Sequence, residues 1–156
     1  MTKNTGINLD FKHFSELSAK EWYALAKKRM EVFIMEQDCH YLDLDDKDLD
    51  AYHIYGTRNN QVIAYARLLA KGVSYPQISI GRVLVVEEER GKNVGHLLMD
   101  KVMQFSVEKY GKNDIKISAQ EHLKKFYEIH GFNVVTEMYY EDDIPHVGML
   151  FEAVNL

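Results

Sequence analysis

A basic, glycine-containing turn is the part of this sequence best suited to chemistry. Its residues are Arg90, Gly91, Lys92, Asn93, Val94 and Gly95. The turn separates a β-like apolar run at 78–86 from an amphipathic helical pattern that begins at about Val94. Backbone N–H groups of a turn and of a helix N-terminus attract an anion, and two cationic side chains beside them add full charge. The turn therefore predicts a binding site for a phosphate-bearing ligand.

The spacing of the turn excludes two common phosphate-binding loops. A nucleoside triphosphate loop needs Gly-x-x-x-x-Gly-Lys followed by Ser or Thr, and this sequence has no such string. A dinucleotide-binding fingerprint needs three glycines in an early β-α-β unit, whereas this turn has two and lies past mid-chain. Any strand-to-helix turn can carry glycine, so Gly91 and Gly95 alone leave a purely structural role open.

An acidic segment at 36–50 invites comparison with a calcium-binding loop. Its aspartates include Asp43, Asp45, Asp46, Asp48 and Asp50. An EF-hand loop requires a central glycine and a closing glutamate, and this segment supplies neither. No His and Cys cluster at metal-ligand spacing occurs in the sequence. We therefore expect no metal site, and a solvated acidic loop that would also attract a cationic amine.

Hydrophobic periodicity defines the elements that must position these residues. Strands are predicted at 7–11, 51–57, 61–70, 78–86, 115–119, 132–140 and 146–153. Helices are predicted at 19–35, after a capping box at 18–21, at 94–110 and at 123–130. Asn59-Asn60 is predicted to form a hairpin turn, and Gly111 and Gly131 to end helices. The order β-α-β-β-β-α-β-α-β-β predicts a mixed α/β (α+β) sheet with helices packed on it, and excludes a regular doubly wound sheet.

Length and composition fit one globular domain. The chain has 156 residues, 46% of them hydrophobic and 28% charged, so we expect residues 1–156 to form a single domain. No apolar run reaches the roughly 20 residues needed to span a bilayer, and residues 1–6 lack the apolar core of a signal peptide. Cys39 is the only cysteine, which favours a reducing, cytoplasmic compartment. The net charge of −5 argues against broad nucleic-acid binding.

The strand, turn and helix at 78–110 resemble the acetyl-CoA motif of the GNAT superfamily of N-acetyltransferases. The family pattern is Arg/Gln-x-x-Gly-x-Gly/Ala, which Arg90, Val94 and Gly95 fit, while Asn93 replaces the middle glycine. Asparagine is the least costly non-glycine residue in a left-handed conformation, so we expect the turn to keep its shape.

A second block, at 118–132, resembles the next cofactor motif of that superfamily. It has a polar residue after a strand, a helix that carries a tyrosine, and then Gly-Phe. Gln120 stands where the family usually has asparagine, and Tyr127 stands at the tyrosine often assigned as the acid. Further segments narrow the resemblance to the ElaA-like acetyltransferases, and they are 32–41, 64–69, 80–83 and 140–149. The resemblance implies a mixed, mostly antiparallel sheet of six to seven strands flanked by helices.

The resemblance also implies direct attack of an amine on the thioester of acetyl-CoA, without a covalent enzyme intermediate. Main chain of 83–85 would pair with pantetheine like an added strand, and N–H groups of 91–96 would hold the pyrophosphate. The implied cofactor-binding residues are Val83, Leu84, Val85, Arg90, Gly91, Lys92, Asn93, Val94, Gly95, His96, Gln120, Phe126 and Tyr127. Tyr127, with an ordinary pKa of about 10, is also the candidate acid. From its spacing alone, Tyr127 would be only an aromatic residue on one face of a helix.

A catalytic base has no comparable motif in the sequence. Candidates in segments that could border the acceptor are Glu36, Asp43, His53, Glu141 and His146. A histidine needs little tuning of its pKa to act near neutral pH, and a carboxylate can act through water. Glu36, His53 and His146 rank first, and a water chain in place of a dedicated base stays open.

Three functions stay open, with an enzyme first. The expected enzyme is a cytoplasmic, acetyl-CoA-dependent N-acyltransferase whose acceptor is a small-molecule amine or a protein or peptide amine. The alternatives are an acyl-CoA-binding sensor module without turnover and a structural or partner-binding domain that retains only the fold. We expect no nucleic-acid or membrane partner, and the β-rich C-terminus could pair sheets in a homodimer. Polyamine, aminoglycoside, small metabolite and protein N-terminus all remain open as acceptors.

Overall fold

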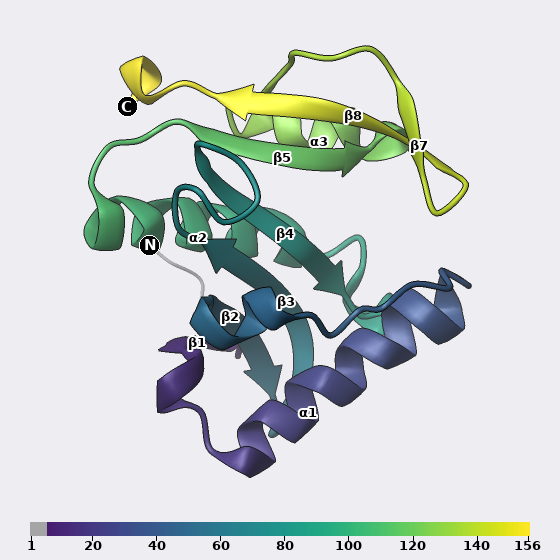
Figure 1. Cartoon of the computed structure of the whole chain (residues 1–156). Coiled ribbons are helices and arrows are strands. Elements are labelled where there is room, and N and C mark those ends of the chain that lie inside the picture. Colours follow the sequence, from purple (N-terminus) through teal and green to yellow (C-terminus); the bar gives the residue numbers. More distant parts are fainter. Residues whose placement is uncertain (1–5) are drawn as a thin grey trace.

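The computed structural model describes residues 6–156 as a twisted sheet with helices on both faces (Figure 1). Helix α1 (Ala19–Arg29) lies in front of the strands, and helix α2 (Val94–Tyr110) and the short helix α3 (Lys124–Ile129) lie behind them. No helix in this part of the chain is long and apolar enough to cross a membrane. The prediction that residues 1–6 form no signal peptide concerns mainly residues 1–5, which lie outside the described residues.

Eight strands form one mixed sheet. They are β1 (Asn8–His13), β2 (Tyr52–Arg58), β3 (Gln61–Leu69), β4 (Ile78–Val85), β5 (Ile115–Gln120), β6 (Asn133–Val134), β7 (Tyr139–Glu141) and β8 (Ile144–Phe151). Their spatial order is β1-β2-β3-β4-β5-β8-β6, and β7 also pairs with β8. Every pair is antiparallel except β4 and β5, which are parallel. The predicted mixed, mostly antiparallel sheet is thus confirmed, with eight strands in place of six to seven.

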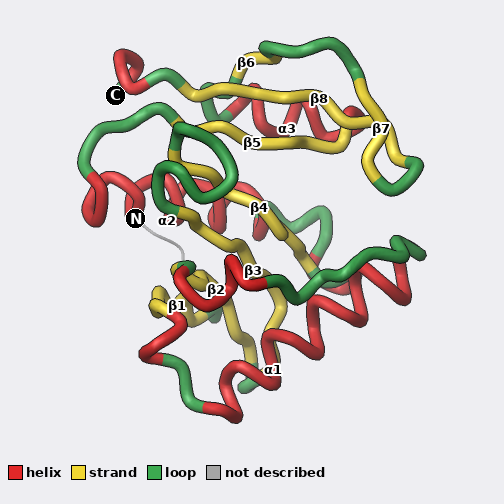
Figure 2. Tube along the Cα trace, viewed as in Figure 1, coloured by secondary structure: helices red, strands yellow, loops and turns green. Residues whose placement is uncertain are grey.

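The additional strand arises because the strand predicted at 132–140 is interrupted. Figure 2 shows a loop between β6 and β7. Val134 pairs with Met149 and Tyr139 with His146, so the four residues 135–138 on one side lie opposite the two residues 147–148 on the other. The surplus residues bulge against Gly148, whose N–H donates to the hydroxyl of Thr136 at 2.7 Å. A Cβ at Gly148 would come within 2.6 Å of Thr136, so this bulge needs a glycine opposite it.

Strands β4 and β5 part soon after they meet. Their register contains only Ile78 with Ile115 and Ser79 with Lys116, and beyond these pairs the two strands diverge (Figure 1). Strand β4 also carries a bulge opposite 65–67 of β3, where Arg82 has a left-handed φ of 52°. A bulge bends its strand and redirects a side chain. The divergence leaves one edge of β4 without a neighbouring strand beside the later part of β5.

The helices follow the sequence prediction with one departure. Helix α2 has the predicted bounds, and Gly111 ends it with a φ of 77°. The helix predicted at 19–35 is α-helical only to Arg29 and continues as a π-helical segment, η2 (Met30–Glu36). Val32 and Phe33 of this segment are both buried in the core. Short 3₁₀ segments complete the chain, and they are η1 (Phe14–Glu16), η3 (Asp46–Asp50), η4 (Glu87–Glu89), η5 (Glu121–Leu123) and η6 (Ala153–Asn155).

Candidate active site

The parting of β4 and β5 leaves two adjoining cavities. The turn-side cavity, of about 340 Å³, lies between the end of β4, the turn at 90–95 and α3. The polar cavity, of about 380 Å³, lies between β3, β4 and the β7–β8 hairpin. Both cavities share part of their lining, which consists of Phe33, Gln37, Val83, Gln120, Leu123 and Tyr127. A ligand in either cavity would therefore meet a ligand in the other at this shared wall.

The turn at 90–95 presents a row of unused backbone donors. The N–H groups of residues 91–96 have no hydrogen-bond acceptor among the described residues, and the first helical bond is from Leu97 to Asn93. Gly91 and Asn93 both have positive φ angles, 77° and 63°. The left-handed conformation expected of Asn93 is thereby confirmed. Free N–H groups at a helix N-terminus form an anion site.

The side chain of Arg90 contacts two groups next to the turn. Its Nε donates to the carbonyl of Val85 at 3.0 Å, and its Nη2 lies 2.6 Å from the carboxylate of Glu36. The hydrogen bond from Arg90 occupies a main-chain acceptor at the free edge of β4. Glu36, one of the predicted bases, is thus an ion-pair partner of Arg90 and is absent from the lining of both cavities.

The structure brings most of the predicted cofactor residues to the turn-side cavity. Those that line it are Val83, Leu84, Val85, Arg90, Gly95, Gln120, Phe126 and Tyr127. Gly95 is needed for close packing, since a Cβ there would lie 3.3 Å from the ring of Phe126. The others, Gly91, Lys92, Asn93, Val94 and His96, do not line the cavity but belong to the row of free N–H groups. The side chain of His96 instead packs on Phe126 and bonds to His130, 2.9 Å away.

Tyr127 lies at the shared wall. It is only 7% exposed, and its ring packs edge-on against Phe126 and Phe132. Burial raises the pKa of its phenol to about 12. The hydroxyl makes no hydrogen bond to another of the residues 6–156 that the structure describes. Tyr127 therefore keeps its proton at neutral pH and has a free donor at the junction of the two cavities.

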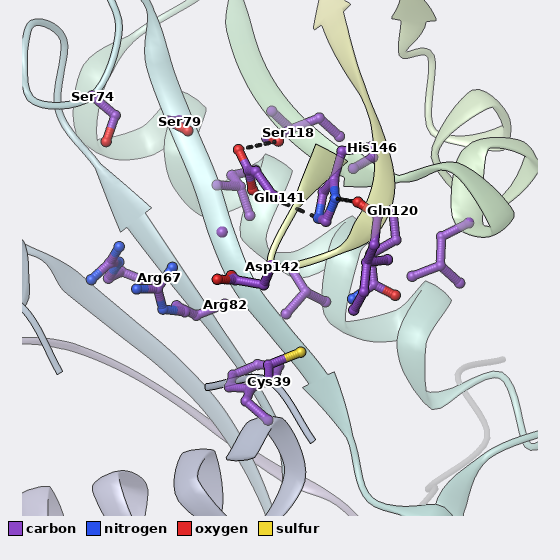
Figure 3. A pocket seen from close by; sticks show the side chains of 18 of the residues that line it. Cys39, Arg67, Ser74, Ser79, Arg82, Ser118, Gln120, Glu141, Asp142 and His146 are labelled. Atoms are coloured by element: carbon purple, nitrogen blue, oxygen red, sulfur yellow. Dashed lines mark hydrogen bonds and ion pairs between the residues drawn. The ribbon is translucent and has the colours of Figure 1, made fainter. Parts of the chain in front are cut away.

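His146 lies on the far side of the polar cavity, together with Glu141 (Figure 3). Its Nδ1 lies 2.7 Å from the carbonyl of Ile144, and because a carbonyl only accepts, Nδ1 carries the proton. The Nε2 is then a free acceptor in the neutral ring, 3.7 Å from Glu141. Glu141 also accepts a hydrogen bond from Ser118 at 3.1 Å. This arrangement can take up a proton and stabilise the imidazolium that results.

The other predicted bases do not reach the cavities. His53 is fully buried between the hydroxyl of Tyr65, 2.7 Å from Nδ1, and the carbonyl of Asp48, 3.0 Å from Nε2. Burial lowers the pKa of His53, and both ring nitrogens are occupied. Asp43 is 3% exposed and pairs with Arg29 at 2.9 Å. Neither His53 nor Asp43 can contact an acceptor in the polar cavity without rearrangement of the core.

The acidic segment is a buried ion-pair network, so the predicted solvated loop is wrong for its central residues. Asp43 and Asp48 are 3% and 2% exposed. The network pairs three aspartates with three arginines, and its members are Asp43, Asp45, Asp48, Arg29, Arg67 and Arg82. Burial alone would raise the pKa of Asp48, but its bonds from Arg29 and Arg67 lower it. Among the described residues, no group of His, Cys, Asp and Glu is placed to hold a metal ion.

Two residues of the polar cavity were missed by sequence reasoning. Arg67 and Arg82 face Glu141 and Asp142 across the cavity (Figure 3). Arg82 stacks over the ring of Tyr41 and lies 3.0 Å from Asp43, although its Nε–H does not point at that carboxylate. A signal existed, because Arg67 interrupts the apolar run at 62–70 and a buried arginine requires a partner.

Comparison with known proteins identifies the family of this chain. Residues 11–153 match the family model described as an acetyltransferase (GNAT) domain. Protein ElaA of Escherichia coli is 43% identical over 145 residues, which cover 92% of this chain and 95% of ElaA. Its crystal structure superposes with a TM-score of 0.89, covering 94% of this chain and 99% of that one. An acyl-CoA N-acyltransferase from Pseudomonas aeruginosa, 41% identical, also gives 0.89 and covers 93% and 99% of the two chains. With this agreement in sequence and fold, the chain belongs to the GNAT family of acetyltransferases, in its ElaA-like branch.

Proposed function

We propose that this protein transfers the acetyl group of acetyl-CoA to a primary amine by direct attack. The observation that carries the proposal is the position of Tyr127, whose free hydroxyl lies where the turn-side and polar cavities meet. A row of free N–H groups lies beside one cavity, and the other cavity has a proton acceptor at His146. A reaction between a phosphorylated cofactor and an amine needs these two sites and an acid between them.

The turn-side cavity would hold the cofactor, which supplies an acyl thioester when bound. N–H groups of residues 91–96 would bind the pyrophosphate, and the free edge of β4 at 83–85 would bind the pantetheine arm. Arg90 would have to release Val85, because its Nε occupies that carbonyl. The negative charge of the pyrophosphate would compete with Glu36 for the same guanidinium.

Two residues would move protons during the transfer. The nitrogen–carbon bond forms as the carbon–sulfur bond breaks. Tyr127 would give its proton to the departing thiolate, and Nε2 of His146 would take the proton that the amine loses, directly or through one water. Glu141 would then stabilise the charged imidazole. No enzyme nucleophile is required, and Cys39 is poorly suited to be one, because burial, aided by Asp142 and Asp38, raises the pKa of its thiol.

The remaining expectations stay predictions about the whole chain. We propose that residues 1–156 act as one acetyltransferase domain. A cytoplasmic location and a homodimer stay predictions as well. The small-molecule amine and the protein or peptide amine both remain candidates at this level of description.

A two-part experiment tests the proposal. Acetyl-CoA should raise the melting temperature of the protein by mass action, and more than acyl-CoAs with longer chains do. Thiol release from acetyl-CoA, followed across a panel of amines, should then depend on both the amine and Tyr127. Stabilisation by acetyl-CoA without amine-dependent thiol release would contradict the proposal and favour a binding module. If acetyl-CoA does not stabilise the protein, the assignment of acetyl-CoA as the cofactor also fails.

A further inference from the structure

Arg67 has hydrogen-bonding capacity that the protein does not use. It lies in the middle of β3, is 4% exposed, and forms part of the polar cavity. Its Nη1 donates to Asp45 at 2.6 Å and to Asp48 at 2.9 Å. Its Nε is buried without a hydrogen-bond partner, and Nη2 has none among the described residues. An unpaired buried donor is unfavourable, so a ligand that satisfies this edge of the guanidinium gains affinity.

The cavity has room for such a ligand next to Arg67. Gly81 of β4 lies directly opposite Arg67 in the register, and a Cβ there would meet no atom within 4 Å. The next residue on the same side of β4 is Ser79, which lines the cavity and has no hydrogen bond from its hydroxyl within residues 6–156. The missing side chain at position 81 therefore leaves open space beside two unused donors.

The charges on the two sides of the cavity are opposite. Arg67 and Arg82 lie on the β3–β4 side, with Lys47 bonded to Ser74 at the rim. Glu141 and Asp142, from the β7–β8 hairpin, lie on the other side with His146 (Figure 3). A ligand with a cationic amine at one end and an anion at the other matches this distribution.

The unused edge of Arg67 also limits which anion fits. Nε and Nη2 form the planar fork that binds a carboxylate through two parallel hydrogen bonds. The three arginines of the network are already balanced by three aspartates, so the wall has little excess positive charge. A singly charged carboxylate suits this site better than a doubly charged phosphate.

We propose that the acceptor is an amino carboxylate, whose carboxylate binds the Nε–Nη2 edge of Arg67 and the hydroxyl of Ser79. Its amine then lies toward His146, Glu141 and Tyr127, where the transfer takes place. This assignment rests on the proposed function and narrows its acceptor to amino acids and related compounds. Polyamines and aminoglycosides lack the group that Arg67 binds.

Matched acceptors test the assignment. Glycine, β-alanine, 4-aminobutyrate, L-alanine and L-leucine are each compared with their own carboxamide in the thiol-release assay. We expect kcat/KM for at least one carboxylate to exceed that of its amide by about tenfold or more, as for hydrogen bonds to a charged group. Carboxamides have the more acidic ammonium group, so amine ionisation would favour them and cannot produce this preference. Aminomethylphosphonate, in place of glycine, should be a poor acceptor.

Two variants connect the preference to the site. Arg67→Lys keeps the charge and loses the fork, and should remove the preference mainly through KM. Gly81→Val fills the open space without touching a charge, and should do the same while stabilisation by acetyl-CoA stays unchanged. Lys28→Met is the control, because Lys28 pairs with Glu31 and lines neither cavity. It should leave the preference intact.

Each outcome decides the assignment. If the amides are acetylated as well as the carboxylates, or if Gly81→Val keeps the preference, the carboxylate site is wrong and the proposed function stands. If no amine releases thiol, the proposed function fails. Titration calorimetry of β-alanine and β-alaninamide into the CoA-loaded protein then decides the carboxylate site alone. Tighter binding of β-alanine, lost in Gly81→Val, supports the site, and equal or no binding overturns it.

Discussion

The two cavities beside β4 differ in the groups that they offer to a ligand, which are main-chain groups in one and side chains in the other. Main-chain groups are available at the turn-side cavity: the edge of 83–85 lines it and the free N–H groups of 91–96 lie beside it, all on one continuous stretch of chain. The polar cavity presents side chains from β3, β4, the segment at 36–50 and the β7–β8 hairpin, held by a buried ion-pair network. A site made of main chain tolerates most side-chain replacements, whereas a network of buried charges depends on each member. The two halves should therefore respond differently to mutation.

Loss of a network arginine should have the largest effect. Arg29→Met removes the cation from Asp43 and Asp48, both buried, and should lower the free energy of unfolding by about 3–5 kcal/mol. Urea denaturation measures this change. The matched control is Lys28→Met, which breaks only the partly exposed pair with Glu31 and should change stability by about 0.5 kcal/mol or less. Equal effects of the two variants would show that the network does not hold the polar cavity together.

Tyr127→Phe tests the proposed acid at the wall that the two cavities share. The variant keeps the ring that packs on Phe126 and Phe132 and removes only the hydroxyl. We expect kcat to fall by about a hundredfold or more, as for loss of a general acid, with little change in the Kd of acetyl-CoA. Single-turnover thiol release and calorimetry measure the two quantities. Unchanged turnover would remove the acid role from Tyr127.

Removing a glycine from the turn and adding one to it should change the stability of the protein in opposite directions. Gly91→Ala puts a Cβ at a positive φ and should cost about 1 kcal/mol of stability, although no atom lies within 4 Å of the new group. Asn93→Gly should raise stability by a smaller amount and leave acetyl-CoA binding intact. Gly72→Ala is the control, because Gly72 has the same kind of φ, also in open space, and does not line either cavity. Only Gly91→Ala should weaken acetyl-CoA binding.

The smallest expected effect concerns Glu36, the ion-pair partner of Arg90, which by the proposed function would compete with the cofactor for that guanidinium. Glu36→Gln removes a partly exposed ion pair and should tighten acetyl-CoA binding by about two- to fivefold. The gain should shrink as salt is added, because exposed charges are screened. Glu31→Gln, which removes an exposed carboxylate that pairs with Lys28, provides the control in calorimetry. Weaker binding in Glu36→Gln would mean that Glu36 supports the cofactor site.

Features set by neighbours in the chain were predictable from the sequence. The capping box is present, with Ser18 and Glu21 each bonded to the other's N–H. Asn59 and Asn60 both take positive φ in the hairpin, and α2 has its predicted bounds. These structures depend on a few adjacent residues, which a sequence displays directly.

Features set by distant partners were not predictable in the same way. The burial of Asp48 depends on Arg29 and Arg67, which lie 19 residues away on either side along the chain. In the sequence a run of aspartates looks solvent-exposed, because the arginines that pair with it are distant along the chain. The break between β6 and β7 depends likewise on Gly148, on the opposing strand. His53 and His146 look alike as candidate bases in the sequence, and only the fold separates a core residue from one that faces a cavity.

The short register between β4 and β5 has a consequence for folding cooperativity. Two residue pairs join the ladder β1–β4 to the ladder β5–β8, so the sheet has a seam at which local opening needs little backbone hydrogen bonding to be lost. Proteins open in cooperative units along such boundaries. A molecule bound along the free edge of β4 would contact both units and raise the free energy of their separation. Amide protons on either side of the seam would then exchange together when the cleft is filled and separately when it is empty.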